Sequence, residues 1–415
     1  MFNICFSNNR SEIHKGENSN SGKGNSNEIE VLKLPNVCVS CGRDLTALDS
    51  RILNIQENRN QPYESVPKFL FPYICLTGFV EVSGRYTRIS YIFTIFLLLV
   101  CADIFLTHGI FFDQRIIKIY LPYLTSYLLT VTAWGTLRRK KRQLTTVLGT
   151  TRDLKLYAHD KMVNFIAIMI CIVTPIISIL LTFLLNKSNQ KRFFYGFEVE
   201  NYWSKIAIMS SKNALYFIIY PCITHAIALL YCVLCLRCSN RINCLCQKIT
   251  QCSPGNFGIP KQQSILKNRT QVRDILLEVQ AVFSVPIFCT IVGNILMCAS
   301  VIGWYLVKKW DDSDIAWKMK IAFYVINAFS NVMATTWVAS ESAISMKKFK
   351  ETFNQKTQKR LLYYDPKGEQ YLKADLLAEP DFVLTGCDII SFKRSTILAL
   401  VGTLLTYTVL LMNTN

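Results

Sequence analysis

The sequence predicts an all-α membrane protein with seven transmembrane helices, and three observations support this fold class. The 415 residues are 51% hydrophobic and only 18% charged. The apolar residues gather in seven separated segments, and about 20 such residues are enough to cross a bilayer as a helix. Lysine and arginine are distributed unevenly among the intervening loops, which is typical of a multi-pass protein.

Residues 1–88 precede the first apolar segment and are predicted to form a cytoplasmic N-terminal region. The stretch 18–27 is rich in asparagine and serine, a composition typical of disorder. Residues 69–80 are apolar but are interrupted by Pro72 and Gly78. They are too short to cross a membrane, so we interpret them as an interfacial helix or turn.

Seven segments are long and apolar enough to span the bilayer. They are residues 89–112, 116–137, 162–185, 206–236, 281–307, 320–344 and 389–412. The first six, with their connections, form a predicted bundle over residues 89–345, in which Pro175 predicts a kink. The seventh belongs to a C-terminal region, residues 389–415.

The placement of basic residues gives the orientation. The N-terminal region, the loops 138–160 and 237–275, and the segment 346–394 carry 34 lysines and arginines, whereas the other three loops carry 8. The N-terminus is therefore predicted inside and the C-terminus outside. The glycosylation sequon at Asn186 then faces outward, whereas the one at Asn268 faces the cytoplasm and stays unmodified. A G-protein-coupled receptor would have the opposite orientation.

No group of residues predicts an enzyme, a cofactor or a metal site. The four histidines lack metal-binding spacing, and no phosphate loop or nucleophile elbow is present. Cys38 and Cys41 supply at most half of a zinc site. A cysteine run over residues 232–252 begins inside a predicted span, which favours apolar packing or palmitoylation. The net charge of +18 is explained by juxtamembrane positions rather than by nucleic-acid binding.

Aromatic and polar side chains recur every three or four residues in several spans, so each set shares one helical face. Tyr127 and Asn294 belong to such stripes. The members predicted in the outer halves of the spans, where they could line a ligand pocket, are Tyr120, Tyr123, Tyr216, Tyr220, Trp304, Tyr324 and Asn327. Individually they also fit interfacial anchors or bridges between helices.

Two charged residues fall within the predicted spans. An unpaired Asp103 would cost about 2.5–3.5 kcal/mol, so it is expected to pair, to be protonated or to face a wet crevice. Lys212 is expected to extend outward toward the membrane surface.

Small and hydroxylated residues follow one face of the last span, which suits helix packing or a lining wetted by water and ions. That span contains Thr406-Tyr407, five mostly apolar residues and Asn413. It resembles the C-terminal signature of insect gustatory receptors: Thr-Tyr, five hydrophobic residues and Gln-Phe. Asn413 replaces the usual glutamine, and Thr414 replaces the phenylalanine. Gly386 and a basic pair precede the span in a similar way.

The resemblance implies a tastant-gated, non-selective cation channel of the plasma membrane, either a homotetramer or a heterotetramer with related receptors. Its partners would be a small-molecule tastant, permeating cations and membrane lipids, and residues 346–388 would form a cytoplasmic anchor. The last helix would line a tetrameric pore, and the outer-half residues would bind the tastant. The implied pore-lining residues are Thr396, Thr403, Thr406, Leu410 and Asn413.

The ligand class is left open by the sequence. Sugar-sensing members tend to carry an acidic residue where this chain has Thr408, which favours bitter or plant-derived compounds over sugars. An odorant receptor subunit that requires a co-receptor would share the topology and is the nearest alternative. A G-protein-coupled receptor is disfavoured by orientation. A transporter is disfavoured because no inverted repeats are visible.

Overall fold

The computed structural model is helical over most of the residues that it describes. These are residues 70–81, 85–109, 117–151, 160–174, 194–307, 315–364 and 376–413, with residues 154, 176–177, 179–180 and 374. All lie in one compact unit, residues 60–415. Cys38, Cys41, Pro175 and Asn186 lie outside the described residues, so the predictions made for them stay predictions.

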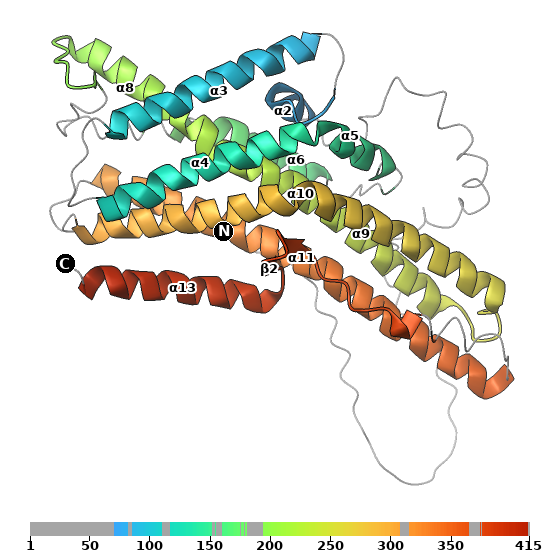
Figure 1. The fold of residues 1–415 in the computed structure, drawn as a ribbon. Helices are drawn as coiled ribbons and strands as arrows, with labels where there is room; N and C mark the ends of the chain where they lie inside the picture. The colour runs from blue at the N-terminus through green and yellow to red at the C-terminus, as the bar shows by residue number, and fades with distance from the viewer. Residues whose placement is uncertain are drawn as a thin grey trace, which may run out of the picture. The chain divides into compact units, whose positions relative to one another are not determined.

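Over the residues that the structure describes, helical structure is found within each of the predicted spans (Figure 1). The first three spans fall on α3 (Arg85–Gly109), α4 (Ile117–Arg139), and α6 (Asp160–Ile168) with η4 (Met169–Val173). The fourth falls on α8 (Tyr202–Phe217), η6 (Ile218–Ile223) and α9 (Thr224–Gln251). The last three fall on α10 (Ile259–Val307), α11 (Ile315–Tyr364) and α13 (Arg394–Asn413).

Among the described residues, four helical stretches are long and apolar enough to cross a membrane. They are Thr87–His108, Tyr202–Gln251, Ile259–Leu306 and Lys318–Leu362, and Arg394–Leu410 is a shorter apolar helix. Helices of this length and composition are those of a multi-pass membrane protein.

Three of the helices extend far beyond the predicted spans. Residues 237–251 and 259–275 were predicted as part of a loop, and this was wrong, because they continue α9 and α10, while residues 346–360 of the predicted anchor segment continue α11. The extensions run side by side at one end of the unit (Figure 1). Their polar residues cover an apolar core in which Phe257 and Phe353 have ring centroids 5.5 Å apart and Phe349 stacks on Phe353 at 6.0 Å.

Helix α10 lies at the centre and packs against α4, α9, α11 and α13. Small residues let α10 and α4 approach closely, as is typical of membrane helices. A Cβ atom added at Gly303 would lie 2.9 Å from Cγ1 of Ile119, and Ser300 donates its hydroxyl to the Ile119 carbonyl at 2.9 Å. The short α4–α10 separation therefore depends on glycine and serine.

The fourth span is interrupted where η6 contains Pro221. Tyr220 leaves helical geometry there, with φ of −131° and ψ of 120°. The hydroxyl of Thr224 donates to the Pro221 carbonyl at 2.7 Å, and Nδ1 of His225 donates to the same oxygen at 2.8 Å. These bonds satisfy a carbonyl at the break, and the Tyr220 side chain is fully buried.

A short helix, α2 (Leu70–Thr77), confirms helical structure within the apolar stretch 69–80. Trp134 of α4 donates its indole N–H to the Thr77 carbonyl at 3.0 Å. Gly78 follows with φ of +74°, and a Cβ atom there would lie 2.0 Å from the hydroxyl of Ser90. Only glycine fits this helix end without rearrangement.

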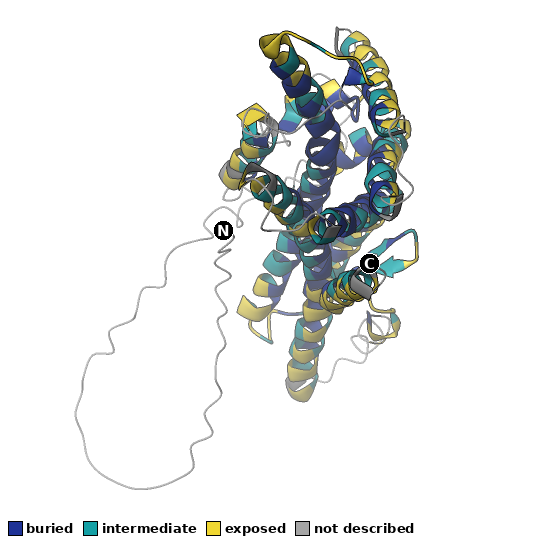
Figure 2. Ribbon diagram, turned by 90° about the vertical axis from the view of Figure 1, so that its left-hand side faces the viewer, coloured by how far each residue is buried: buried dark blue, intermediate teal, exposed yellow. Residues whose placement is uncertain are grey.

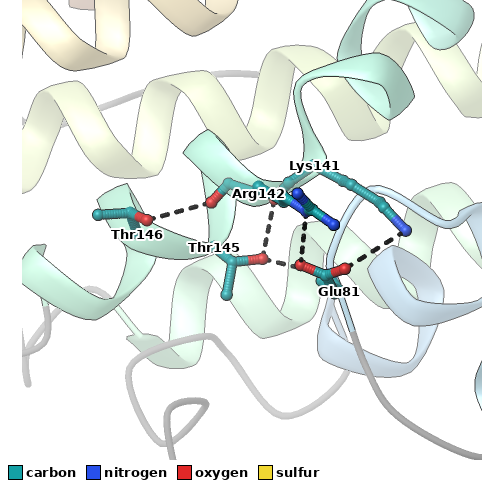
Figure 3. A network of polar contacts seen from close by, with 5 residues as sticks. All are labelled: Glu81, Lys141, Arg142, Thr145 and Thr146. Carbon is teal, nitrogen blue, oxygen red and sulfur yellow. Dashed lines mark hydrogen bonds and ion pairs between the residues drawn. The ribbon is translucent and has the colours of Figure 1, made fainter. Parts of the chain in front are cut away.

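The segment after α2 is tied to α5 (Lys141–Thr150) through Glu81 (Figure 3). The Glu81 carboxylate lies 3.7 Å from Lys141 and 3.5 Å from Arg142, and its backbone N–H donates to the Thr145 hydroxyl at 3.1 Å. All these side chains are partly exposed, so the ion pairs contribute little individually.

A hairpin precedes the last helix. Strand β1 (Thr385–Gly386) pairs with β2 (Ile390–Ser391) through a turn in which Cys387 and Asp388 have φ of 52° and 56°. The seventh span was predicted to begin at residue 389, which was wrong, because α13 begins at Arg394. The backbone N–H of Phe392 is bonded to the Leu384 carbonyl at 2.9 Å, which holds it out of the helix.

Candidate ligand-binding site and pore helix

Asp103 is the centre of a polar cluster between α3 and α8. Its carboxylate lies 3.0 Å from Nζ of Lys212 and accepts a hydrogen bond from the Tyr216 hydroxyl at 2.6 Å and another from Tyr195. The Lys212 ammonium lies 3.8 Å from the centroid of the Tyr195 ring, which is a cation–π contact. Asp103 is therefore paired, one of the three arrangements that the sequence left open.

Lys212 was expected to extend outward, and this was wrong. Its side chain is only 15% exposed and its ammonium points to the carboxylate on α3. A counter-charge within reach, together with an aromatic ring, stabilises the ammonium better than a long path to the membrane surface. The pair fastens α8 to α3.

An aromatic cluster joins α3, α4 and α10. His108 has ring-centroid distances of 5.4 Å to Tyr120 and 5.1 Å to Tyr123. Tyr120 meets Trp304 edge-to-face at 5.1 Å. Tyr123 donates its hydroxyl to that of Tyr127 at 3.2 Å, and their rings are 5.0 Å apart. The rings thus form one continuous series of favourable aromatic contacts.

The series continues through η6 to α11. The ring of Tyr220 lies 6.0 Å from that of Tyr127 and stacks on that of Tyr324 at 6.1 Å. The ring centroids of Phe217 and Tyr324 are 5.3 Å apart. The Tyr220 hydroxyl donates to Oδ1 of Asn294 at 2.7 Å, where both side chains are buried. Four helical elements and the break at η6 therefore meet at these rings.

Most of the sequence-predicted pocket residues converge here. Tyr120, Tyr123, Tyr220, Trp304 and Tyr324 belong to the aromatic series, and Tyr216 belongs to the Asp103 cluster. Asn327 is half-buried, and its Nδ2 donates to the Phe323 carbonyl of its own helix at 2.6 Å. That bond is typical of a structural role.

Several members of the site were not predicted from the sequence. Tyr127 and Asn294 belonged to the polar stripes but were not selected, since they lie deeper than the outer halves. His108 lies in the last turn of α3 and Tyr195 precedes α8, and neither had a periodic signal. The opposite charges of Asp103 and Lys212 in two spans were the one usable indication of a pair.

The arrangement offers ring faces, hydroxyls and one ion pair to a small molecule. Its inner end is filled, because Tyr127 and Tyr220 are fully buried. At its other end His108, Tyr123 and Trp304 are only half-buried. A compound that enters there could stack on rings and exchange hydrogen bonds with phenol groups.

The aromatic series also reaches the last helix. Asn294, which accepts a hydrogen bond from the Tyr220 hydroxyl, lines a small cavity of about 10 Å³ between α10, α11 and α13. Leu400, Val401 and Leu404 of α13 form its other wall. A space of this size holds at most about one water molecule, so the packing between the aromatic series and α13 is close.

Helix α13 packs one face on α10 and α11 and leaves the opposite face exposed (Figure 2). The packed face contains Ile397, which is 9% exposed. The exposed face carries three of the predicted pore positions, Thr403, Thr406 and Leu410, together with the small residues Ala399 and Gly402. This face is directed away from the rest of the described chain.

Two predicted pore residues differ from the others. Thr396 is half-buried, and its hydroxyl donates to the Ser391 carbonyl at 2.6 Å, so it fixes the start of α13. Asn413 is the last residue of the helix, and its side chain lies outside the described residues. Thr403 and Thr406 donate to carbonyls of their own helix at 3.0 and 2.9 Å.

The cysteine run lies on α9, and its buried members pack toward α11. Cys232, Cys235 and Cys238 are buried, and the thiol of Cys232 contacts the Ala334 carbonyl at 3.7 Å. Within the described part of the chain, no three histidine, cysteine or acidic side chains are grouped so that they could hold a metal ion.

No family model matches this sequence, and no curated protein matches it. Solved structures do match. The insect olfactory receptor OR5 from Machilis hrabei in complex with eugenol superposes with a TM-score of 0.66 at 14% identity, over 83% of this chain and 97% of that chain. The chain has the fold of an insect olfactory receptor. Another structure of OR5 gives a TM-score of 0.64 at 13% identity, with the same coverage.

The match confirms the chemosensory-receptor fold that the C-terminal signature predicted. Insect gustatory and olfactory receptors share this fold, so the comparison does not separate the two classes. At this level of identity the comparison concerns the fold.

Proposed function

We propose that this chain is an insect gustatory receptor that acts as a tastant-gated, non-selective cation channel of the plasma membrane. The observation that carries the proposal is helix α13. It contains the Thr406-Tyr407 signature, and its small and hydroxylated face is exposed while its opposite face packs on the bundle. The fold of an insect olfactory receptor around that helix supports the same conclusion.

In the proposed assembly, the exposed faces of four α13 helices surround one pore. Thr403 and Thr406 offer hydroxyl groups to the passage, and Leu410 and Asn413 form rings near its outer end. A ring of leucines blocks conduction by dewetting when it is narrow, whereas a ring of amides forms a hydrated and weakly selective constriction. The seven spans have the N-terminus inside and the C-terminus outside, as the basic residues predict.

Cysteine accessibility tests this pore. A Thr403→Cys channel is expected to lose current when a charged thiol reagent is applied, because the reagent enters the pore. A Leu404→Cys channel is the matched control, since Leu404 lines the packed side of α13. Equal sensitivity of the two channels would count against the assignment. An Asn413→Ala channel with unchanged ion selectivity and gating would count against the role of that ring.

We propose that the tastant is a small bitter or plant-derived compound that binds at the outer end of the aromatic series. Half-buried His108, Tyr123 and Trp304 provide ring faces and hydrogen-bonding groups there. The relative of the same fold binds eugenol, a small aromatic phenol, and the tyrosine-rich site suits that chemistry. Sugars also stack on aromatic rings, so a sugar-sensing receptor is the alternative ligand class.

Opening requires a ligand that binds the open conformation more tightly than the closed one. The contacts offer a direct route, from Tyr220 through its 2.7 Å bond to Asn294, and from Asn294 to the packed face of α13. A ligand that shifts the rings would thereby change the packing of the pore helix.

An odorant receptor subunit that requires a co-receptor is the second candidate, and the fold comparison supports it equally. The two candidates differ in whether the chain conducts alone. A G-protein-coupled receptor is disfavoured, since the C-terminal end of α13 is predicted to face outside.

The deciding experiment is whole-cell recording from cells that express this chain alone, with bitter compounds and sugars applied separately. A cation current evoked without added G protein is expected, and the active compounds give the ligand class. A current that requires a co-expressed co-receptor would favour the odorant-receptor alternative. A response that depends on G protein would refute the channel.

A further inference from the structure

A cavity of about 360 Å³ lies beside the start of α13, on the side opposite to the aromatic series along the chain's predicted membrane axis. Its walls come from α11, from the segment 379–383 and from the residues that lead into α13, with Arg269 contributed by α10. Much of the lining is apolar: Ala343, Ile344, Met346, Phe382, Val383 and Phe392. Five basic and two acidic side chains also line it.

Three of the basic side chains already have structural roles. Arg269 lies 2.5 Å from the carboxylate of Glu379, and Lys350 donates to the Glu379 carbonyl at 2.7 Å. Arg394 lies 3.0 Å from Glu341 and 4.4 Å from the centroid of the Trp337 ring. These contacts fix the walls of the cavity and neutralise Glu379.

The other two basic residues, Lys347 and Lys393, are exposed. Neither ammonium group has an ion-pair or hydrogen-bond partner among the described residues. Asp381 is also exposed and is the acidic side chain of the lining that remains uncompensated. The cavity therefore keeps a positive rim above an apolar lining, which is the pattern that an anionic amphiphile requires.

The position of the cavity indicates which amphiphile it binds. Lys393 directly precedes the apolar helix α13 and Arg394 is its first residue, and both belong to the segment whose basic residues are predicted to face the cytoplasm. Basic clusters at this level recognise anionic lipid head groups of the inner leaflet. Ile344, in the wall, is 40% exposed, and Leu398, one turn into α13, is 74% exposed. Both offer apolar surface to an acyl chain.

We propose that this cavity binds an anionic phospholipid of the cytoplasmic leaflet. Its phosphate-bearing head group contacts Lys347 and Lys393, and its acyl chains lie against the apolar wall at Ile344. The inference rests on the membrane orientation given under the proposed function. Because the head group contacts the residues where the pore helix begins, bound lipid holds the start of α13 in place.

The test uses the purified full-length chain in detergent and native mass spectrometry. Phosphatidylinositol 4,5-bisphosphate is the anionic probe and phosphatidylcholine the neutral one. Each lysine near an anionic head group contributes about fivefold to affinity, so the K347Q/K393Q variant is expected to bind the anionic lipid at least about tenfold more weakly. K348Q/K359Q removes the same charge from exposed positions of α11 outside the cavity and is expected to bind as the unmodified chain does.

Several results would overturn the proposal. One is that the two double variants bind the anionic lipid equally well. Another is that the chain binds phosphatidylcholine as tightly as the anionic lipid. A third is that the free inositol phosphate binds as tightly as the anionic lipid, which would identify a soluble ligand. Lipid that binds single chains but is absent from the assembled tetramer would assign the cavity to a subunit interface instead. Because the assay needs no current, lipid binding by a chain that never conducts would refute the proposed function and leave this site intact.

Discussion

The ion pair between Asp103 and Lys212 gives the sharpest prediction about stability. The change to make is Lys212→Met, which keeps the length of the side chain and removes its charge. Asp103 would retain the hydroxyl donors of Tyr195 and Tyr216 but would lose the ammonium at 3.0 Å. The carboxylate would then be partly buried without a counter-charge, which is costly in a low-dielectric environment.

The size of the effect follows from burial. Removing one partner of a fully buried pair costs about 3–5 kcal/mol. The Lys212 and Asp103 side chains are 15% and 23% exposed, so solvent screens part of the interaction, and about 2 kcal/mol is expected for Lys212→Met. Asp103→Asn is expected to cost about 1 kcal/mol, because Lys212 keeps the Tyr195 ring. The double variant is expected to cost about 1 kcal/mol rather than the sum.

The assay is thermal melting of the purified receptor in detergent, followed by the loss of the intact species in size-exclusion chromatography. Lys205→Met, on the same helix, is the control for removing a lysine and is expected to melt as the unmodified chain does. If the losses from Lys212→Met and Asp103→Asn simply add in the double variant, the two residues are not energetically coupled. That result would refute the assignment of the cluster as an ion pair.

Two further changes probe helix packing. Tyr220→Phe removes the donor to buried Asn294 and is expected to cost about 1–3 kcal/mol, with a lower melting temperature and a smaller current at saturating ligand. A normal current would show that this bond does not transmit gating. Gly303→Ala places a Cβ 2.9 Å from Cγ1 of Ile119 and is expected to destabilise by about 1–3 kcal/mol. Gly135→Ala meets nothing within 4 Å and is expected to stabilise by up to about 1 kcal/mol, so melting shifts of the same sign would contradict the packing argument.

The membrane helices were predictable because a bilayer-length apolar segment leaves few alternatives. The extensions of α9, α10 and α11 beyond those segments were not predictable in the same way, since a helix with a polar face resembles a loop in composition. The information was nevertheless present in the spacing. Ile242, Leu245 and Ile249 are separated by three and four residues, and all three are buried. The same spacing test, applied outside the apolar segments, would have extended α9.

The candidate site was predictable only as far as helical periodicity reaches. Tyr120, Tyr123 and Tyr127 share one face of α4 because of their spacing, and the structure places all three in the aromatic series. Periodicity within one helix does not show which other helices that helix contacts. The contacts of Asp103 with Tyr195 and Lys212 join residues about a hundred positions apart, and one of them comes from a loop.

The length of α11 has a mechanical consequence. Its 50 residues correspond to about 75 Å at 1.5 Å per residue, more than twice the roughly 30 Å hydrocarbon thickness of a membrane. A tilt of only about 3° around its middle would displace each end by about 2 Å over that length. Tyr324 lies near one end of this helix and Lys347 beyond its middle. The helix can therefore act as a lever, through which a small rearrangement at the tyrosines near one end becomes a movement of the residues toward the other end.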